Sequence, residues 1–249
     1  MSIVLHQFLF SHFNDKARWA LSYKDIPHER QTYLPGPHRG PIKKLSGQNS
    51  TPVLQDADQV VSGSANIVAH LEALQPSPAL YPEDPALKQA AIAFEKRFDD
   101  EVGPATRTVM FEALAEEGGY LTRMFGANKS LAKRLGYRAI FPVAKGMIKK
   151  GNGITPELIA QRKQITLNAL DEVAAATQET GYIIGGSFTV ADLTAACLFA
   201  PLANPSHPDM ARPQPAPGSI QAILDRYKDH PAIAWTNRMY TLHRPMPDE

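Results

Sequence analysis

Two serines stand where the sequence predicts the start of a helix. Ser11 comes just before a segment that Asn14 and Asp15 can cap, and Ser64 opens a second helical segment. At a helix N-terminus, a hydroxyl acts together with free backbone N–H groups and the helix dipole to stabilise an anion. Each serine also has a simpler explanation, because serine is common in turns and as a helix N-cap. The two positions are therefore candidate sites for binding an anion.

Other kinds of chemistry find no support in the sequence. The single cysteine, Cys197, excludes an internal disulfide framework and a Cys-x-x-Cys motif, and its apolar neighbours predict a small buried hydrophobic residue. The histidines show no metal-ligand spacing, and no glycine-rich phosphate loop is present. His12 is close enough to Ser11 to act as a base, but a histidine in such a turn is more often a partly exposed polar residue. We therefore expect no metal site and no catalytic role for His12.

The first 77 residues predict a small α/β domain. Apolar, β-branched runs indicate strands, and one of the helical segments joins the first two strands, which makes those strands parallel. A loop rich in Pro, Gly and His follows the second strand, and a hairpin turns at Ala57 and Asp58. The expected order is β–α–β–(short α)–β–β–α, with the strands and longer helices over residues 3–10, 16–24, 28–34, 51–56, 59–61 and 64–74.

The remainder of the chain predicts helices only. Four prolines between residues 76 and 85 indicate an extended linker, and strand signals disappear after it. Helical patterns cover residues 86–117, with a break near Gly103 and Pro104, and a stretch that starts at Thr155. An almost wholly apolar stretch over residues 193–202 follows a capping box at Thr189 and Asp192. A last helical pattern covers residues 231–243. We expect an all-helical second domain over residues 86–249.

Composition places the chain among globular proteins. Of its 249 residues, 43% are hydrophobic and 20% are charged, which excludes a disordered or fibrous chain. No run approaches the 18 apolar residues of a membrane span, and the N-terminus has neither the basic lead nor the apolar stretch of a secretory signal. We expect a cytoplasmic protein.

In this arrangement, the sequence resembles the glutathione S-transferases, in which a thioredoxin-like domain precedes a helical bundle. The matching segments are residues 11–18 (SHFNDKAR) at the family's first strand–helix turn, residues 50–54 (STPVL) at its Val-Pro-x-Leu with a cis-proline, residues 63–67 (GSANI) at its Glu-Ser-x-Ala-Ile, residues 185–192 at its helix-capping signature, and residues 230–231 and 238–239 in its last helix. Their order and spacing over nearly the whole chain carry the resemblance.

The resemblance implies a site for glutathione as co-substrate. A free thiol has a pKa near ~8.5, so a donor that stabilises the thiolate activates it. Serine-type members of the family use a serine at the position of Ser11, which implies that Ser11 activates the sulfur for attack on a small apolar electrophile. It also implies that Thr51 and Pro52 align the peptide backbone and that Ser64 binds the γ-glutamyl carboxylate. Asn14 is a candidate for a second hydrogen bond to the sulfur, and helix capping alone also explains it. The family further implies a homodimer that acts in detoxification.

Two positions depart from the family's pattern. Gly63 occupies the candidate position where the family usually has a Glu or Gln that holds the amino group of glutathione, and Ser50 stands where Lys or Gln is common. The two contacts to glutathione that the family makes at these positions are therefore missing or are made by other residues. A non-catalytic ligand-binding or interaction protein on the same fold therefore stays open, as does a glutathione-dependent isomerase or dehalogenase.

Residues 119–153, here called the basic insert, concentrate the positive charge. They hold eight basic side chains and no acidic one, so the rest of a chain of net charge +1 carries −7. Apolar residues alternate with these charges, so the insert is amphipathic. It is consistent with a helical lid over the site, with contact to an anionic membrane surface, or with a charged outer face of packed helices. A basic groove interleaved with aromatic residues is absent, so we expect no nucleic-acid partner.

Overall fold

The N-terminal part of the protein is built on a four-stranded mixed sheet. A computed structural model describes residues 3–139, 141 and 155–247. The strand order is β2-β1-β3-β4, with β1 (Ile3–Gln7) parallel to β2 (His28–Thr32), and β3 (Val53–Asp56) antiparallel to both β1 and β4 (Gln59–Ser62). The expected parallel pair and hairpin are confirmed. The first two strands are shorter than expected, because the chain turns at Phe10 (φ 56°) and at Gly36 (φ 100°).

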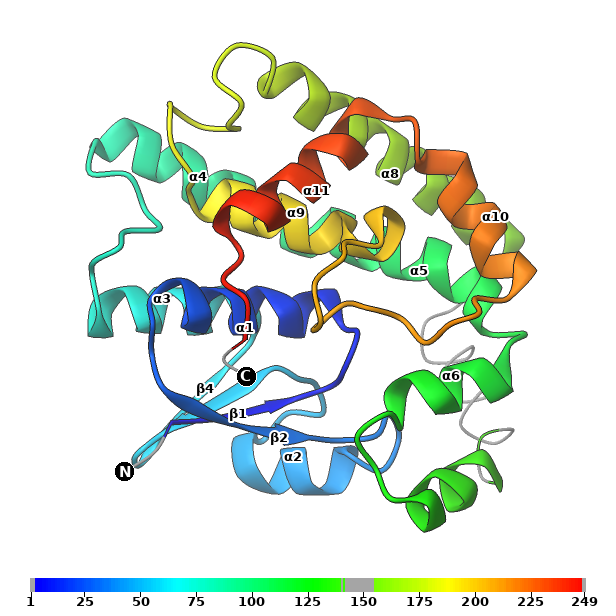
Figure 1. Cartoon of the computed structure of the whole chain (residues 1–249). Coiled ribbons are helices and arrows are strands. Elements are labelled where there is room, and N and C mark those ends of the chain that lie inside the picture. The colour runs from blue at the N-terminus through cyan, green and yellow to red at the C-terminus, as the bar shows by residue number, and fades with distance from the viewer. Residues whose placement is uncertain (1–2, 140, 142–154, 248–249) are drawn as a thin grey trace.

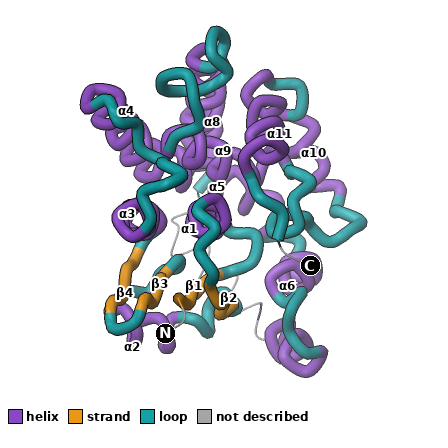
Figure 2. Tube along the Cα trace, turned by 60° about the vertical axis from the view of Figure 1, so that its left-hand side comes forward, coloured by secondary structure: helices purple, strands orange, loops and turns teal. Residues whose placement is uncertain are grey.

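Two helices cover one face of this sheet and one covers the other (Figures 1 and 2). α1 (His12–Tyr23) and α3 (Ser64–Leu74) lie between the sheet and the helical domain, and α2 (Arg39–Ser46) lies on the opposite face. This is the expected thioredoxin-like α/β arrangement.

Both candidate helix starts differ in detail from the prediction. α1 begins four residues earlier than expected, because Ser11 is its extended N-cap and the Ser11 carbonyl accepts the Asp15 N–H at 2.8 Å. Asn14 and Asp15 are therefore not caps but buried residues within the first turns. In α3 the N-cap is Gly63, and Ser64 is the first helical residue.

The C-terminal part is a helical bundle, as expected. It contains α4 (Pro85–Arg97), a π-helical turn η1 (Phe98–Val102), α5 (Gly103–Leu114), α6 (Gly118–Phe125), α8 (Pro156–Ala176), α9 (Val190–Ala203), α10 (Gly218–Tyr227) and α11 (Pro231–His243), with a further helical segment over residues 131–139. The expected break near Gly103 and Pro104 is wrong. The chain stays helical there because Pro104 lies in the first turn of α5, where a missing N–H is tolerated, directly after the wider π turn.

Helix α9 forms the centre of the bundle. Thr189 and Asp192 form the expected capping box, and helices α1, α4, α5, α10 and α11 pack around it. Its position between the other helices is visible in Figure 1. Cys197 is fully buried in this helix, and burial raises the pKa of its thiol well above the ordinary value. The expectation of a buried hydrophobic role for Cys197 is confirmed.

Charged side chains tie α1 to the helical domain. Asp15 is fully buried and pairs with Arg18 at 3.2 Å and with Arg244 at 3.3 Å, and it accepts the Tyr240 hydroxyl. Lys16, also fully buried, pairs with Asp99 at 2.7 Å on the turn after α4. The helix that follows Ser11 is thus held from two sides of the bundle.

The basic insert is described only in part. Its first residues form α6 and the 131–139 segment, while Lys145, Lys149 and Lys150 lie outside the described residues. No helix within the described ranges is long and apolar enough to cross a membrane.

Candidate functional site

Ser11 is held in position by Asn14. The Asn14 Nδ2 group donates to Ser11 Oγ at 2.7 Å, Asn14 is fully buried, and Ser11 is half-buried. Because this bond uses a lone pair of Ser11 Oγ, the hydroxyl proton of Ser11 stays free to donate to another acceptor. The pair therefore presents a hydroxyl donor at the N-terminus of α1, the geometry that stabilises an anion.

The other four predicted residues lie together. Thr51, Pro52, Gly63 and Ser64 line one cavity of about 320 Å³, here called the Ser64 pocket. The Thr51–Pro52 peptide is cis, and the Gly63 N–H donates to the Pro52 carbonyl at 3.1 Å, which joins this turn to the start of α3. Ser11 and Asn14 are not among the lining residues. Phe13, the second residue of α1, is the residue of that helix that lines the pocket.

Gly63 has a conformational reason to be glycine. Its φ is +89°, a region that residues with a side chain rarely adopt, and a Cβ there would meet only Asn66 Nδ2 at 3.9 Å. The space beside it is therefore open, and the position contributes no side chain to the Ser64 pocket. Ser50 lines the same pocket with a short hydroxyl only.

An acid that the sequence did not single out also lines the Ser64 pocket. Asp99 belongs to the π turn η1, and its Oδ2 pairs with Lys16 Nζ at 2.7 Å. Its other oxygen, Oδ1, is buried with no hydrogen-bond partner among the described residues. Burial raises the pKa of the Asp99 carboxyl, and Lys16 opposes this effect. The pocket thus contains a carboxylate oxygen, Asp99 Oδ1, that can accept a hydrogen bond from a ligand.

Arg107 of α5 brings a cation to the same pocket. Its Nε atom is buried with no hydrogen-bond partner, and it forms no ion pair with a carboxylate in the described part of the chain. Burial and the nearby Arg162 lower the pKa of the guanidinium. Arg107 is half-buried, and a partly desolvated cation without a counterion is costly, so it favours an anionic group in the pocket. No spacing signal marked Arg107 or Asp99 in the sequence, because both depend on how the helix continues through residues 98–103.

His12 is not the partly exposed turn residue that the sequence suggested. It is buried, and its ring stacks at a tilt on Phe13 with centroids 4.5 Å apart. Burial, with the positive charge of Arg107, lowers the pKa of His12 to about 3. The imidazole is therefore neutral at pH 7 and forms part of the contact between α1 and α5.

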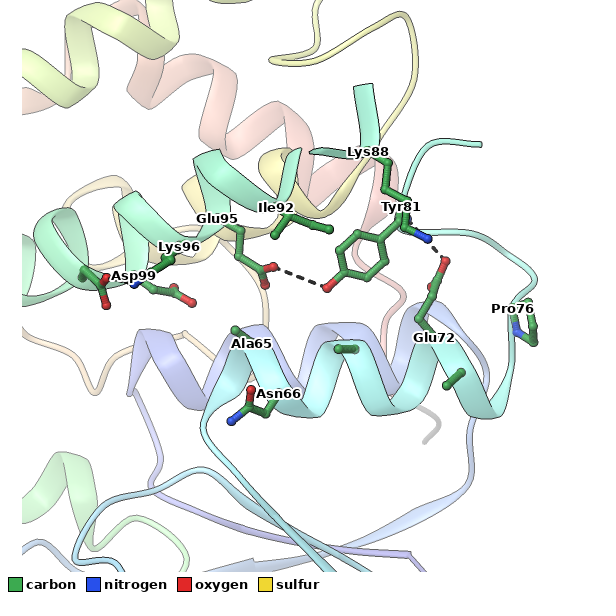
Figure 3. A pocket seen from close by; sticks show the side chains of 13 residues that line it. Ala65, Asn66, Glu72, Pro76, Tyr81, Lys88, Ile92, Glu95, Lys96 and Asp99 are labelled. Atoms are coloured by element: carbon green, nitrogen blue, oxygen red, sulfur yellow. Dashed lines mark hydrogen bonds and ion pairs between the residues drawn. The ribbon is translucent and has the colours of Figure 1, made fainter. Parts of the chain in front are cut away.

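A larger groove between α3 and α4 adjoins the Ser64 pocket (Figure 3). It has a volume of about 800 Å³ and shares Ala65, Asn66 and Asp99 with the smaller cavity. Figure 3 shows Tyr81 and Ile92 between the two helices, with the Tyr81 hydroxyl directed at Glu95, to which it donates at 3.3 Å. Asp99 therefore stands where the groove and the pocket meet.

The described residues contain no group of three or more His, Cys, Asp or Glu side chains that could hold a metal ion.

Comparison with solved structures gives the same fold in many proteins. A glutathione S-transferase from Rhodospirillum rubrum is 16% identical, with a TM-score of 0.64 over 96% of this chain and 88% of that chain. The β-etherase LigF from Sphingobium is 18% identical, with a TM-score of 0.59 over 96% and 99%. A glutathione S-transferase from Methylobacterium radiotolerans, in complex with glutathione sulfonate, is 18% identical, with a TM-score of 0.56 over 100% and 97%. No curated protein matches the sequence.

Family comparison matches both parts of the chain. The glutathione S-transferase N-terminal domain matches residues 5–79, which contain most of the sheet, Ser11 and the cis-proline turn of the Ser64 pocket. The glutathione S-transferase C-terminal domain matches residues 145–235, which contain the buried helix α9 and its cap. The chain belongs to the glutathione S-transferase family.

Proposed function

We propose that the protein is a cytoplasmic glutathione transferase that joins the thiolate of glutathione to a small apolar electrophile. The observation that carries the proposal is the Asn14–Ser11 hydrogen bond of 2.7 Å, which leaves the Ser11 proton free to donate. A hydrogen bond from Ser11 to the sulfur favours the thiolate over the thiol, and the N-terminus of α1 adds to this effect. Asn14 then acts on the sulfur through Ser11 rather than by direct contact.

In this proposal the Ser64 pocket binds the peptide part of glutathione. The backbone of Thr51, held by the cis peptide to Pro52, aligns the cysteinyl part, and Ser64 with the free N–H groups of α3 takes the γ-glutamyl carboxylate. Arg107 adds a positive charge on the same wall. Asp99 supplies the carboxylate that Gly63 does not, with its Oδ1 available to the amino group of glutathione.

Ser11→Ala tests the proposed activation. Loss of a hydrogen bond to a charged sulfur costs about 1.5–3 kcal/mol, so we expect turnover of a generic aromatic halide to fall by about 10- to 100-fold while glutathione binding persists. The pKa of the bound thiol, followed by thiolate absorbance, rises in the variant. Ser206→Ala, at an exposed serine away from both cavities, is the matched control. Equal rates for Ser11→Ala and wild type would remove Ser11 from the mechanism.

A non-catalytic ligand-binding role is the second candidate. It is favoured by the absence of Ser11 from the lining of the Ser64 pocket and by the short side chains at positions 50 and 63. Retention on immobilised glutathione without turnover of any electrophile supports this candidate, and turnover in a retained protein supports the transferase. A protein that regenerates glutathione during turnover is an isomerase or a dehalogenase instead.

We also propose that the protein forms a homodimer. Ile92 is 45% exposed and lines the groove between α3 and α4 together with Ala69 and Tyr81, and a second copy would cover this apolar part of the groove. Light scattering on the purified protein should give twice the chain mass of 27.3 kDa. A single-chain mass at micromolar concentration contradicts the dimer and leaves the transferase proposal in place.

A further inference from the structure

A separate cavity in the helical domain is lined by three arginines. It has a volume of about 520 Å³ and lies between α6, the 131–139 segment and the loop over residues 215–217. Arg123, Arg134 and Arg138 line it, and none of its lining residues is an Asp or a Glu. We call it the arginine pocket. It shares no lining residue with the Ser64 pocket.

Contacts with neighbouring residues position Arg123 and the stem of Arg134. Arg123 donates to the Pro215 carbonyl at 3.2 Å and lies over the Tyr120 ring at 5.2 Å, while its Nε is buried with no partner in the described part of the chain. The aliphatic stem of Arg134 crosses Gly126, where a Cβ would lie only 3.1 Å from Arg134 Cγ. Arg138 follows Arg134 by one helical turn, so the two side chains lie on one face of the segment.

The segment that carries two of these arginines is fixed to the rest of the molecule. The Tyr137 hydroxyl donates to the Pro35 carbonyl at 2.9 Å, and the Tyr137 ring meets Phe141 edge-on. Lys129, just before the segment, donates to the Thr32 carbonyl at 2.7 Å. The arginine face is therefore presented by a helix that is docked on β2 and the loop after it.

No carboxylate of the described residues neutralises this cluster. Arg123, Arg134 and Arg138 form no ion pair there, and the carboxylate of Glu117, at the N-cap of α6, accepts the Ser219 hydroxyl at 2.8 Å. A further cation, Arg212, is half-buried near Tyr120 but does not line the pocket; desolvation lowers its pKa only to about 10, so it stays charged at pH 7. The Tyr120 hydroxyl is itself buried with no described partner. Like charges gathered without a counterion favour a bound anion.

The arginine pocket also has apolar walls. Leu131 and Leu135 are 67% and 58% exposed, and both line it together with Pro215 and Pro217. The planar fork of arginine matches the oxygens of a phosphate in pairs, and several guanidinium groups suit a doubly charged group better than a single carboxylate. We propose that the arginine pocket binds an organic phosphate, in which the phosphate contacts the arginines and an apolar group contacts the leucines and prolines.

Binding of phenyl phosphate, measured by calorimetry on the full chain, tests the proposal. We expect phenyl phosphate to bind more tightly than inorganic phosphate, and Arg134→Gln and Arg138→Gln each to weaken it by about tenfold or more, the usual effect of losing a charge-assisted hydrogen bond. Lys133→Gln is the matched control, because Lys133 is exposed, adjacent and not a lining residue. It should change the affinity by less than about twofold, as expected of a surface charge.

The same variants distinguish a soluble phosphate from a lipid headgroup. Cosedimentation with phosphatidylcholine vesicles that contain phosphatidic acid, lost in Arg134→Gln and Arg138→Gln but kept in Lys133→Gln, assigns the pocket to a lipid phosphate. Binding of phenyl phosphate without cosedimentation assigns it to a soluble one. Failure of both, or equal weakening by the Lys133 control, overturns the proposal. Arg138 is exposed, so its replacement keeps the test valid if Arg134→Gln unfolds.

Discussion

At the scale of single residues, the central finding is that Asn14 orients the Ser11 hydroxyl. Asn14 is buried in the first turn of α1, and its side-chain amide donates a hydrogen bond to Ser11 Oγ. The sequence predicted Asn14 as a cap or as a direct contact to a ligand. The side chain is not the cap; it donates to the Ser11 hydroxyl, and its contact with a ligand stays a prediction. Sequence pattern cannot separate this role from capping, because both place an Asn within four residues of a helix start.

Asp99→Asn is the residue-scale prediction for peptide recognition. An amide at this position still accepts a hydrogen bond but no longer carries the charge that attracts an ammonium, so we expect the KM for glutathione to rise by about tenfold with a smaller change in kcat. Glutaryl-Cys-Gly, which lacks the amino group, is the comparison substrate. Wild type should prefer glutathione to this analogue, and the variant should lose the preference.

Asp100→Asn is the matched control for this prediction. Asp100 lies beside Asp99 and forms an exposed pair with Lys96, but it does not line the Ser64 pocket. We expect it to keep the preference for glutathione. If both variants keep the preference, the amino group is held by another residue.

At the scale of elements, the contact between α1 and α5 positions the site. Gly103 begins α5, and Phe13 of α1 lies so close that a Cβ there would stand 2.4 Å from Phe13 Cζ and 3.2 Å from Leu198 Cδ2. Phe13 in turn forms part of the Ser64 pocket. The absence of a side chain at position 103 therefore determines where a wall of the pocket stands.

Gly103→Ala should disturb both stability and the pocket. Overpacking of this kind costs about 1–3 kcal/mol, which outweighs the gain of up to about 1 kcal/mol in helix propensity. We expect a lower free energy of unfolding in urea and a higher KM for glutathione. Gly119→Ala in α6 meets open space and should not destabilise the protein. Equal stability of the two variants would mean that Phe13 moves aside without cost.

The elements that the sequence predicted well are those with complete local signals. The α9 helix had its Thr189–Asp192 capping box and an unbroken apolar run, and the β3–β4 hairpin had a clear turn. The continuous helical conformation through residues 98–103 was not predictable from the sequence, because a π turn needs no distinctive residue and a proline such as Pro104 usually indicates the end of a helix. Asp99 and Arg107 owe their place in the site to that conformation. Thr51, Pro52, Gly63 and Ser64 come from two short segments, residues 50–54 and 63–67, that resemble the family's motifs, and the structure brings the two segments together at one cavity.

At the scale of the whole molecule, buried ionisable groups link stability to pH. The pKa of His12 is about 3 in the folded protein, below the ordinary value of 6.5, so the unfolded chain binds the proton more readily. The stabilising contribution of neutral His12 is therefore complete above pH 6.5 and is lost as the pH falls towards 3.

His12→Gln should reduce this dependence. Glutamine keeps a hydrogen-bonding group but does not titrate, so the variant should lose about 2 kcal/mol less than wild type between pH 7 and pH 5. Urea unfolding at the two pH values gives the measurement. Parallel losses in the two proteins would show that other groups carry the acid sensitivity.

The burial of Asp15 has a consequence for the order in which the protein can fold during synthesis. Asp15 lies in the first helix, and Arg244 and Tyr240, two of the groups that satisfy it, belong to the last stretch of the chain. Until the ribosome has released that stretch, the helix that follows Ser11 holds a carboxylate with only Arg18 to neutralise it. We therefore expect the N-terminal domain on its own to leave the Asp15 carboxylate short of two partners, so that its core is completed only together with α11.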